Sequence, residues 1–158
     1  MVLDYGCGYG AFLRYLREIC PSASYVGVDL VPEMVAAARA LNANDPHATF
    51  VDAIDGLPDV NVAILNGVFH VRQEELVASW EAYARDSLQH VWRATSSCMA
   101  FNVLSLYSDA DRRSHHRYYG APEDWLSWCV ATFGRHVFIL HDYGLYEFTM
   151  LVRRQPDG

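Results

Sequence analysis

A glycine-rich turn near the start of the chain constrains the fold more than any other feature. Gly6, Gly8 and Gly10 directly follow the apolar segment Met1 to Tyr5, and an amphipathic segment comes next. Because glycine has no Cβ, the backbone of such a turn can approach a ligand closely. The N-terminus of the following helix adds N–H groups that can bind the ligand. The pattern therefore predicts the first strand and helix of an α/β fold, with a nucleotide-like ligand at the turn.

Strand-like and helix-like segments alternate along the rest of the chain. Strands are expected at residues 25–29, 48–52, 60–66, 98–107, 135–141 and 145–154, and helices at 10–19, 33–41, 73–95 and 122–133. This alternation is typical of a mostly parallel sheet flanked by helices. The last two strands are separated only by residues 142–144, so they should form an antiparallel hairpin. We expect one α/β domain over residues 1–158 with a seven-stranded sheet, and a link at residues 53–59 too short for a full helix.

Composition excludes several classes of protein. A net charge of -7 argues against a broad nucleic-acid-binding surface, because such surfaces are basic. Arg112, Arg113 and Arg117 do cluster with two histidines, and we interpret this cluster as a solvated loop. The apolar runs are of strand length, so no membrane span is expected. With no secretory signal and no Cys-x-x-Cys pair among four cysteines, we expect a reduced, cytoplasmic protein.

Aspartates stand at successive strand ends. Asp29 ends the second strand, where a carboxylate can accept hydrogen bonds from ribose hydroxyls, and Asp52 ends the third, near the expected place of an adenine amino group. Asp4 precedes the glycines and would put a carboxylate beside the positive end of a sulfonium cofactor. The same charge would repel a pyrophosphate. The looser dinucleotide pattern leaves a small NAD(P)-dependent oxidoreductase as an alternative.

The segment from Val2 to Gly10 resembles the first motif of class I S-adenosylmethionine-dependent methyltransferases, and residues 26–29 and 50–53 resemble their second- and third-strand motifs. The resemblance implies a Rossmann-like three-layer sandwich that binds S-adenosylmethionine and releases S-adenosylhomocysteine. It implies cofactor contacts for Asp4, Gly6, Cys7, Gly8, Gly10, Asp29, Leu30, Asp52, Ala53, Asn66 and Gly67.

Members of that family usually carry a helical segment before the first strand that covers the cofactor. This chain begins inside the expected first strand. We therefore expect an N-terminally truncated chain, or a cover supplied by a homodimer or another partner. A cofactor-binding accessory domain without catalysis of its own remains an alternative function.

The acceptor should bind at the rim formed by the carboxyl ends of the parallel strands. The residues expected to line its pocket are Phe69, Tyr107, Tyr118, Tyr119 and Tyr143, and the candidate general bases are His141 and His70, then His115 and His116. A neutral imidazole can remove a hydroxyl proton near neutral pH. We expect a small-molecule acceptor, methylated at oxygen first and nitrogen second, because residues 66–69 lack the Asn/Asp-Pro-Pro-aromatic signature of many amino-group methyltransferases acting on nucleic acids and proteins. No metal is expected, since adjacent loop histidines lack a helical spacing and no third ligand is obvious.

Overall fold

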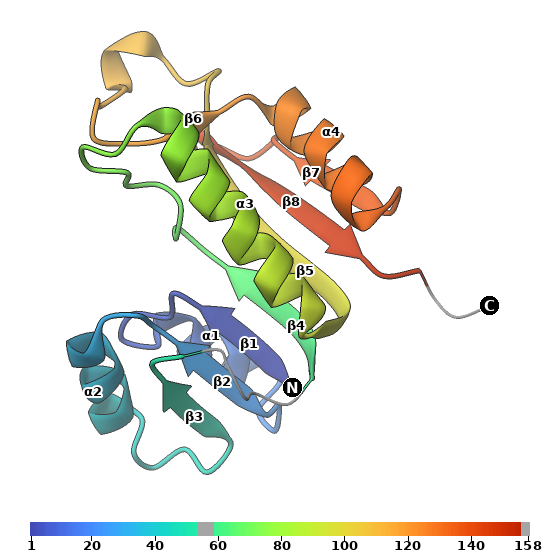
Figure 1. Cartoon of the computed structure of the whole chain (residues 1–158). Helices are drawn as coiled ribbons and strands as arrows, with labels where there is room; N and C mark the ends of the chain where they lie inside the picture. The colour runs from blue at the N-terminus through green and yellow to red at the C-terminus, as the bar shows by residue number, and fades with distance from the viewer. Residues whose placement is uncertain (54–58, 156–158) are drawn as a thin grey trace.

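The computed structural model describes residues 1–53 and 59–155 as a single twisted sheet with helices on both faces (Figure 1). The strands are β1 (Val2–Tyr5), β2 (Tyr25–Val28), β3 (Ala48–Val51), β4 (Val60–Leu65), β5 (Thr95–Ser105), β6 (Tyr119–Gly120), β7 (Val137–Leu140) and β8 (Glu147–Arg153). The helices are α1 (Ala11–Ile19), α2 (Pro32–Leu41), α3 (Val77–Arg93) and α4 (Pro122–Phe133), with a 3-10 turn at Ala110–Arg112.

The strand order is β3-β2-β1-β4-β5-β8-β7. The first five strands of this order run parallel, and β8 lies antiparallel between β5 and β7. This confirms the predicted mostly parallel sheet with its antiparallel C-terminal hairpin. The short β6, which pairs with the end of β5, was not predicted. Most of the link at residues 53–59 lies outside the described residues.

Helix α3 begins later than predicted, at Val77 instead of residue 73. The reason is local: residues 72–75 form a turn closed by a hydrogen bond of 3.1 Å from the N–H of Glu75 to the carbonyl of Arg72. Gln73 in this turn has a φ of 53°, which a helix cannot contain. This turn lies in the loop between β4 and α3 and carries the polar side chains of residues 72–75.

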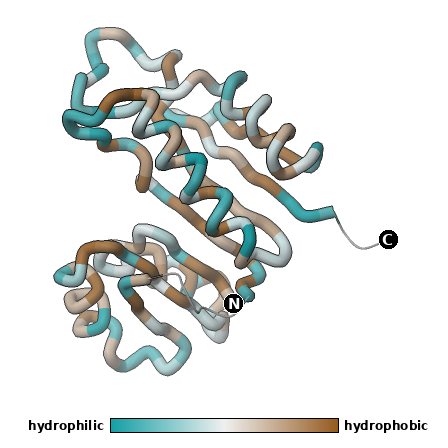
Figure 2. The backbone as a smooth tube through the Cα atoms, in the orientation of Figure 1, coloured by the Kyte–Doolittle hydropathy of each residue, from teal (hydrophilic) through white to brown (hydrophobic). Residues whose placement is uncertain are grey.

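Two apolar layers hold the sheet between its helices. The larger one packs α3 and α4 on one face, where Trp125 of α4 meets Phe101 of β5 at a ring separation of 5.5 Å. The smaller one packs α1 and α2 against the other face of β1–β3 and centres on Tyr25 and Phe50. Figure 2 shows hydrophobic colour along the central strands and hydrophilic colour on many of the connecting loops.

The carboxyl ends of β1, β2, β4 and β5 meet at one rim, because these strands are parallel. The rim therefore collects the glycine turn, the residues after β2, and the loops that follow β4 and β5 (Figure 1). Among the described residues, no helix has the length and apolar character needed to cross a bilayer.

Candidate cofactor and acceptor site

The glycine turn after β1 is held tightly against β2. The N–H groups of Gly6 and Cys7 donate to the carbonyl of Val28 at 2.7 and 3.0 Å. Gly6 has a φ of 75°, and a Cβ added there would lie 2.6 Å from a methyl of Val68. Gly8 has a φ of 53°, and a Cβ added there would meet nothing within 4 Å. Gly6 is thus required by packing, whereas Gly8 leaves open space where a ligand can approach.

Asp29 connects the end of β2 to this turn. Its Oδ2 accepts a hydrogen bond of 2.8 Å from the N–H of Gly8, and its Oδ1 accepts one of 3.0 Å from the N–H of Val31. A carboxylate offers about four acceptor positions, so two remain for other donors. The side chain is therefore fixed in place and still able to bind a pair of ribose hydroxyls.

A cavity of about 230 Å³ opens beside Asp29. Its walls come from β1, the end of β2, the loop after β4 and helix α3; the lining residues are Tyr5, Gly6, Val28, Asp29, Leu30, Val68 and Tyr83. The predictions included Gly6, Asp29 and Leu30 and missed the rest. Tyr83 comes from helix α3, far along the chain from the glycine turn.

Asp4 lies under the turn instead of in this cavity. Side chains alternate along a strand, so Tyr5 faces the α3 side while Asp4 faces α1 and α2. The Asp4 carboxylate is 4% exposed and accepts a hydrogen bond of 2.7 Å from the Tyr25 hydroxyl. Asp4 does not line the cavity, so its expected place beside the cofactor sulfur stays a prediction. Its burial raises the pKa of the Asp4 carboxyl from 3.8 to about 6, with the Tyr25 hydrogen bond acting against the rise.

The pKa of Asp4 makes a testable contribution to stability. Between about pH 4 and pH 6, Asp4 is protonated in the folded protein and ionised in the unfolded chain. The free energy of unfolding therefore falls by up to about 3 kcal/mol as the pH rises through this range. Asp4→Asn lacks this titration. Urea unfolding at a series of pH values measures the free energy of unfolding of both proteins. The value for Asp4→Asn minus the value for the native protein should rise between about pH 4 and pH 7. A flat difference for Asp4→Asn would contradict the assignment.

The other predicted cofactor residues are placed less closely. The Cys7 side chain is buried among residues of α1 and α2, and burial raises the pKa of its thiol to about 12, so only its backbone belongs to the turn. Gly10, with a φ of 78°, starts α1. Asp52 and Ala53 are exposed just after β3, outside the described cavity. Their contacts with adenine remain predictions.

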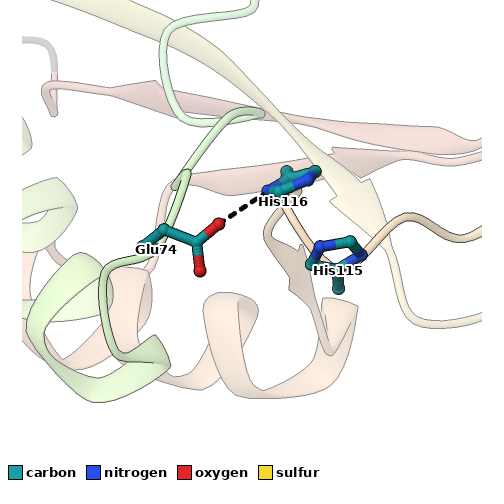
Figure 3. Close-up of side chains that lie close together, drawn as sticks. All are labelled: Glu74, His115 and His116. Carbon is teal, nitrogen blue, oxygen red and sulfur yellow. Dashed lines mark ion pairs between the residues drawn. The ribbon is translucent and has the colours of Figure 1, made fainter.

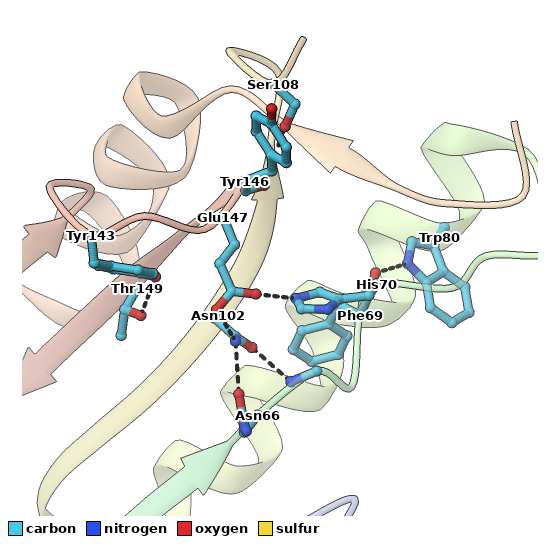
Figure 4. Close-up of polar contacts among 11 residues, drawn as sticks. Asn66, Phe69, His70, Trp80, Asn102, Ser108, Tyr143, Tyr146, Glu147 and Thr149 are labelled. Carbon is cyan, nitrogen blue, oxygen red and sulfur yellow. Dashed lines mark hydrogen bonds and ion pairs between the residues drawn. The ribbon is translucent and has the colours of Figure 1, made fainter. Parts of the chain in front are cut away.

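A polar network at the carboxyl ends of β4 and β5 adjoins the loop after β4 (Figure 4). The Asn102 side chain joins it together: Oδ1 accepts from the N–H of Gly67 at 2.7 Å, and Nδ2 donates to Asn66 at 2.7 Å and to Glu147 at 3.0 Å. The other oxygen of Glu147 lies 3.5 Å from Nε2 of His70. The network therefore places Nε2 of His70 near a carboxylate that is itself held in place, although no hydrogen bond joins the two groups.

His70 is placed as a general base would be. Its side chain is 19% exposed, and burial lowers its pKa below 6.5, an effect that the nearby Glu147 carboxylate opposes. The imidazole is therefore neutral at pH 7. With Nε2 directed at Glu147, Nδ1 is the atom left to accept a proton, and it lies 3.9 Å from the position of a Cβ added to Gly67. In ligand-free structures such catalytic contacts are often long.

Two of the residues expected in the acceptor pocket lie in the core. Phe69 is 0% exposed and Tyr118 is 1% exposed, so neither side chain can reach a ligand in this structure. The Tyr118 hydroxyl donates to Glu81 at 2.8 Å and accepts from Trp125 at 3.1 Å. A tyrosine in a loop gave no sign of this, because the burial depends on packing against α3 and α4.

The remaining predicted rim residues stay accessible. Tyr107 is 68% exposed and donates to Glu123, while the half-buried Tyr143 shares a hydrogen bond of 2.8 Å with Thr149 (Figure 4). Tyr119 lies in β6 and accepts from the N–H of Ser114 at 3.0 Å. The exposed ring of His141 lies 6.2 Å from that of Tyr107 and has no carboxylate contact among those found in the described residues. His115 and His116 lie together on an exposed turn.

Comparison with known proteins decides the family. A family model described as a methyltransferase domain matches residues 2–94, which include the glycine turn, Asp29 and the polar loop after β4. The chain belongs to this methyltransferase family. Class I members use S-adenosylmethionine, so the enzyme is an S-adenosylmethionine-dependent methyltransferase and the predicted cofactor is confirmed. The match also favours the methyltransferase over the oxidoreductase alternative.

Similar proteins are also named as methyltransferases. The methyltransferase is 40% identical over 153 residues to a Mycobacterium tuberculosis protein provisionally named a methyltransferase, covering 96% of this chain and 91% of that one. It is 37% identical over 83 residues to trans-aconitate 2-methyltransferase of Mycobacterium tuberculosis, covering 50% of this chain and 31% of that protein.

Solved structures share the fold. Human N-acetylserotonin methyltransferase in complex with S-adenosylmethionine superposes with a TM-score of 0.71 at 17% identity, covering 97% of this chain and 47% of that one. The magnesium protoporphyrin IX methyltransferase of Synechocystis with bound S-adenosylhomocysteine gives a TM-score of 0.71 at 14% identity, covering 98% and 74%. The chain thus spans about half the length of the first of these structures and three quarters of the second.

Proposed function

We propose that this methyltransferase methylates an oxygen atom of a small-molecule acceptor, with His70 as the general base. The observation that carries the proposal is the pairing of a neutral, half-buried His70 with Glu147 beside the loop that follows β4. An oxygen acceptor with a weakly acidic hydroxyl needs such a base. An exposed histidine would serve less well.

In this proposal, one set of residues binds the cofactor and another set positions the base. Asp29 and the glycine turn bind and orient S-adenosylmethionine, which supplies an activated methyl group when bound. Asn102 fixes Gly67 and Glu147, and Glu147 orients the ring of His70. Nδ1 of His70 takes the acceptor's hydroxyl proton as the oxygen is methylated. Alignment of the acceptor with the methyl group supplies much of the rate enhancement.

The small-molecule class rests on charge and on named relatives. The net charge of -7 disfavours a polyanionic acceptor. Trans-aconitate 2-methyltransferase and N-acetylserotonin methyltransferase are named for small compounds, although a chain of an RNA repair complex shares the fold as well. RNA is therefore the comparison that a test must include.

A panel of acceptors tests the proposal. The protein with S-adenosylmethionine should release S-adenosylhomocysteine in the presence of phenols or hydroxylated sugars, and should not do so with RNA or with an unfolded protein. Turnover with RNA alone would contradict the small-molecule proposal. Tight cofactor binding without turnover on any acceptor would favour the accessory-domain alternative.

A further inference from the structure

Two turns on the rim bring three metal-ligating side chains together (Figure 3). Glu74 lies in the turn at residues 72–75, which precedes α3. His115 and His116 are the central residues of a turn at residues 114–117, closed by a hydrogen bond of 3.1 Å from the N–H of Arg117. A tight turn between the two histidines lets adjacent side chains lie on the same side, which an extended loop would not do.

The three side chains are close enough to share one ion. Nδ1 of His116 lies 3.1 Å from a carboxylate oxygen of Glu74, and the two imidazole rings lie 3.7 Å apart. One ligand atom from each residue can be chosen so that all three lie within 4.8 Å of one another. Ligands bound tetrahedrally at about 2.0–2.2 Å from zinc are roughly 3.3–3.6 Å apart, so small side-chain rotations would suffice.

The backbone holds these two turns in register. The N–H groups of Arg72 and Gln73 both donate to the carbonyl of His116 at 3.0 Å, and the Arg72 guanidinium donates to the carbonyl of His115 at 2.6 Å. An antiparallel bridge joins residues 71 and 117. Gln73 is the one non-glycine residue of the described chain with a positive φ, and such strain is maintained only where surrounding contacts impose it. The fold therefore fixes the backbone positions of the three residues, while their side chains stay exposed and free to turn toward an ion.

We propose that Glu74, His115 and His116 bind a divalent transition-metal ion of the zinc class. Two imidazole nitrogens and one carboxylate oxygen form a donor set that zinc accepts, with a fourth position left for water. This departs from the expectation that no metal binds, which rested on the lack of a helical spacing between the adjacent histidines and on the lack of an obvious third ligand. Glu74 is that ligand, and it was not evident because it comes from a different loop.

A metal ion at this site would affect the rim segment that carries the proposed base, His70. The N–H of Tyr118, two residues after His116, donates to the carbonyl of His70 at 3.0 Å. An ion at the three ligands would fasten the loop after β4 to the loop after β5 and so stiffen the segment that carries His70. The metal proposal itself stands on the ligand geometry and does not require His70 to be the base.

Calorimetric titration of the chelator-treated protein with zinc chloride tests the site. We expect one ion per chain, and a binding constant that Glu74→Gln, His115→Ala and His116→Ala each weaken by about tenfold or more. His47→Ala, which removes another exposed histidine far from these turns in the sequence, should bind zinc as the native protein does. Cobalt should give the absorption bands of a tetrahedral ion in the native protein and His47→Ala.

Folding and ligand loss can be separated, because all three ligands are exposed. Without metal, the variants should unfold at nearly the native temperature, and added zinc should raise the unfolding temperature only in the native protein and in His47→Ala. Equal zinc affinity in the native protein and in all three ligand variants would overturn the proposal, as would the absence of zinc binding to the native protein.

Discussion

Replacing Asp29 by alanine should weaken binding of S-adenosylhomocysteine by about 100-fold. The Asp29 carboxylate holds the N–H groups of Gly8 and Val31 and has acceptor positions left for the ribose. Hydrogen bonds to a charged group are each worth about 1.5–3 kcal/mol, and a loss of about 2.7 kcal/mol corresponds to a 100-fold change in the dissociation constant. Calorimetric titration of the two proteins with S-adenosylhomocysteine measures the change.

Two further variants make this result specific. Asp29→Asn keeps one oxygen acceptor and loses the charge, so its affinity should fall between those of the native protein and Asp29→Ala. Asp111→Ala removes a side chain that is 82% exposed and should bind as the native protein does. Unchanged affinity in Asp29→Ala would mean that the cofactor does not lie against the end of β2.

Replacing His70 by glutamine should lower kcat by about 10²–10⁴-fold, the usual contribution of a general base, once the panel has identified an acceptor. The affinity for S-adenosylhomocysteine should change little, because His70 lies outside the cavity beside Asp29. His141→Gln and His47→Gln should each cost much less. A larger loss in His141→Gln than in His70→Gln would transfer the role of base to the exposed histidine.

The pH profile separates a base from a merely structural residue. Activity should rise with pH through the pKa of His70, which burial holds below 6.5, because only the neutral ring accepts a proton. The Glu147 carboxylate raises this pKa, so Glu147→Gln should shift the acidic limb of the profile to lower pH. An unshifted limb in Glu147→Gln would contradict the proposed pair.

The fold could be predicted because its signals are local. Apolar segments of strand length alternate with amphipathic ones, and the short separation of the last two strands requires an antiparallel pair. The glycine turn and Asp29 likewise lie within one β-α-β segment. By contrast, β6 forms only through pairing of Tyr119 and Gly120 with β5, a contact between segments that no local pattern indicates.

The parts of the site that were missed depend on which side of a strand a residue faces or on pairing between distant strands. Strand alternation places the side chain of Asp4 on the face of the sheet that α1 and α2 cover and Tyr5 in the cavity, a consequence that could have been drawn from the sequence. The partnership of Asn102 with Glu147 requires the antiparallel register of β5 and β8. The polar Asn102 within the apolar run from Cys98 to Leu104 was the one available signal.

A crystal structure of the protein with S-adenosylhomocysteine tests the central claim most directly. The account predicts that the ribose hydroxyls bind the Asp29 carboxylate beside the glycine turn, and that the sulfur faces the segment at residues 66–68. It also predicts an acceptor position within about 3–4 Å of Nδ1 of His70, directly or through one water molecule. S-adenosylhomocysteine bound away from Asp29, or with its sulfur directed away from His70, would contradict the account.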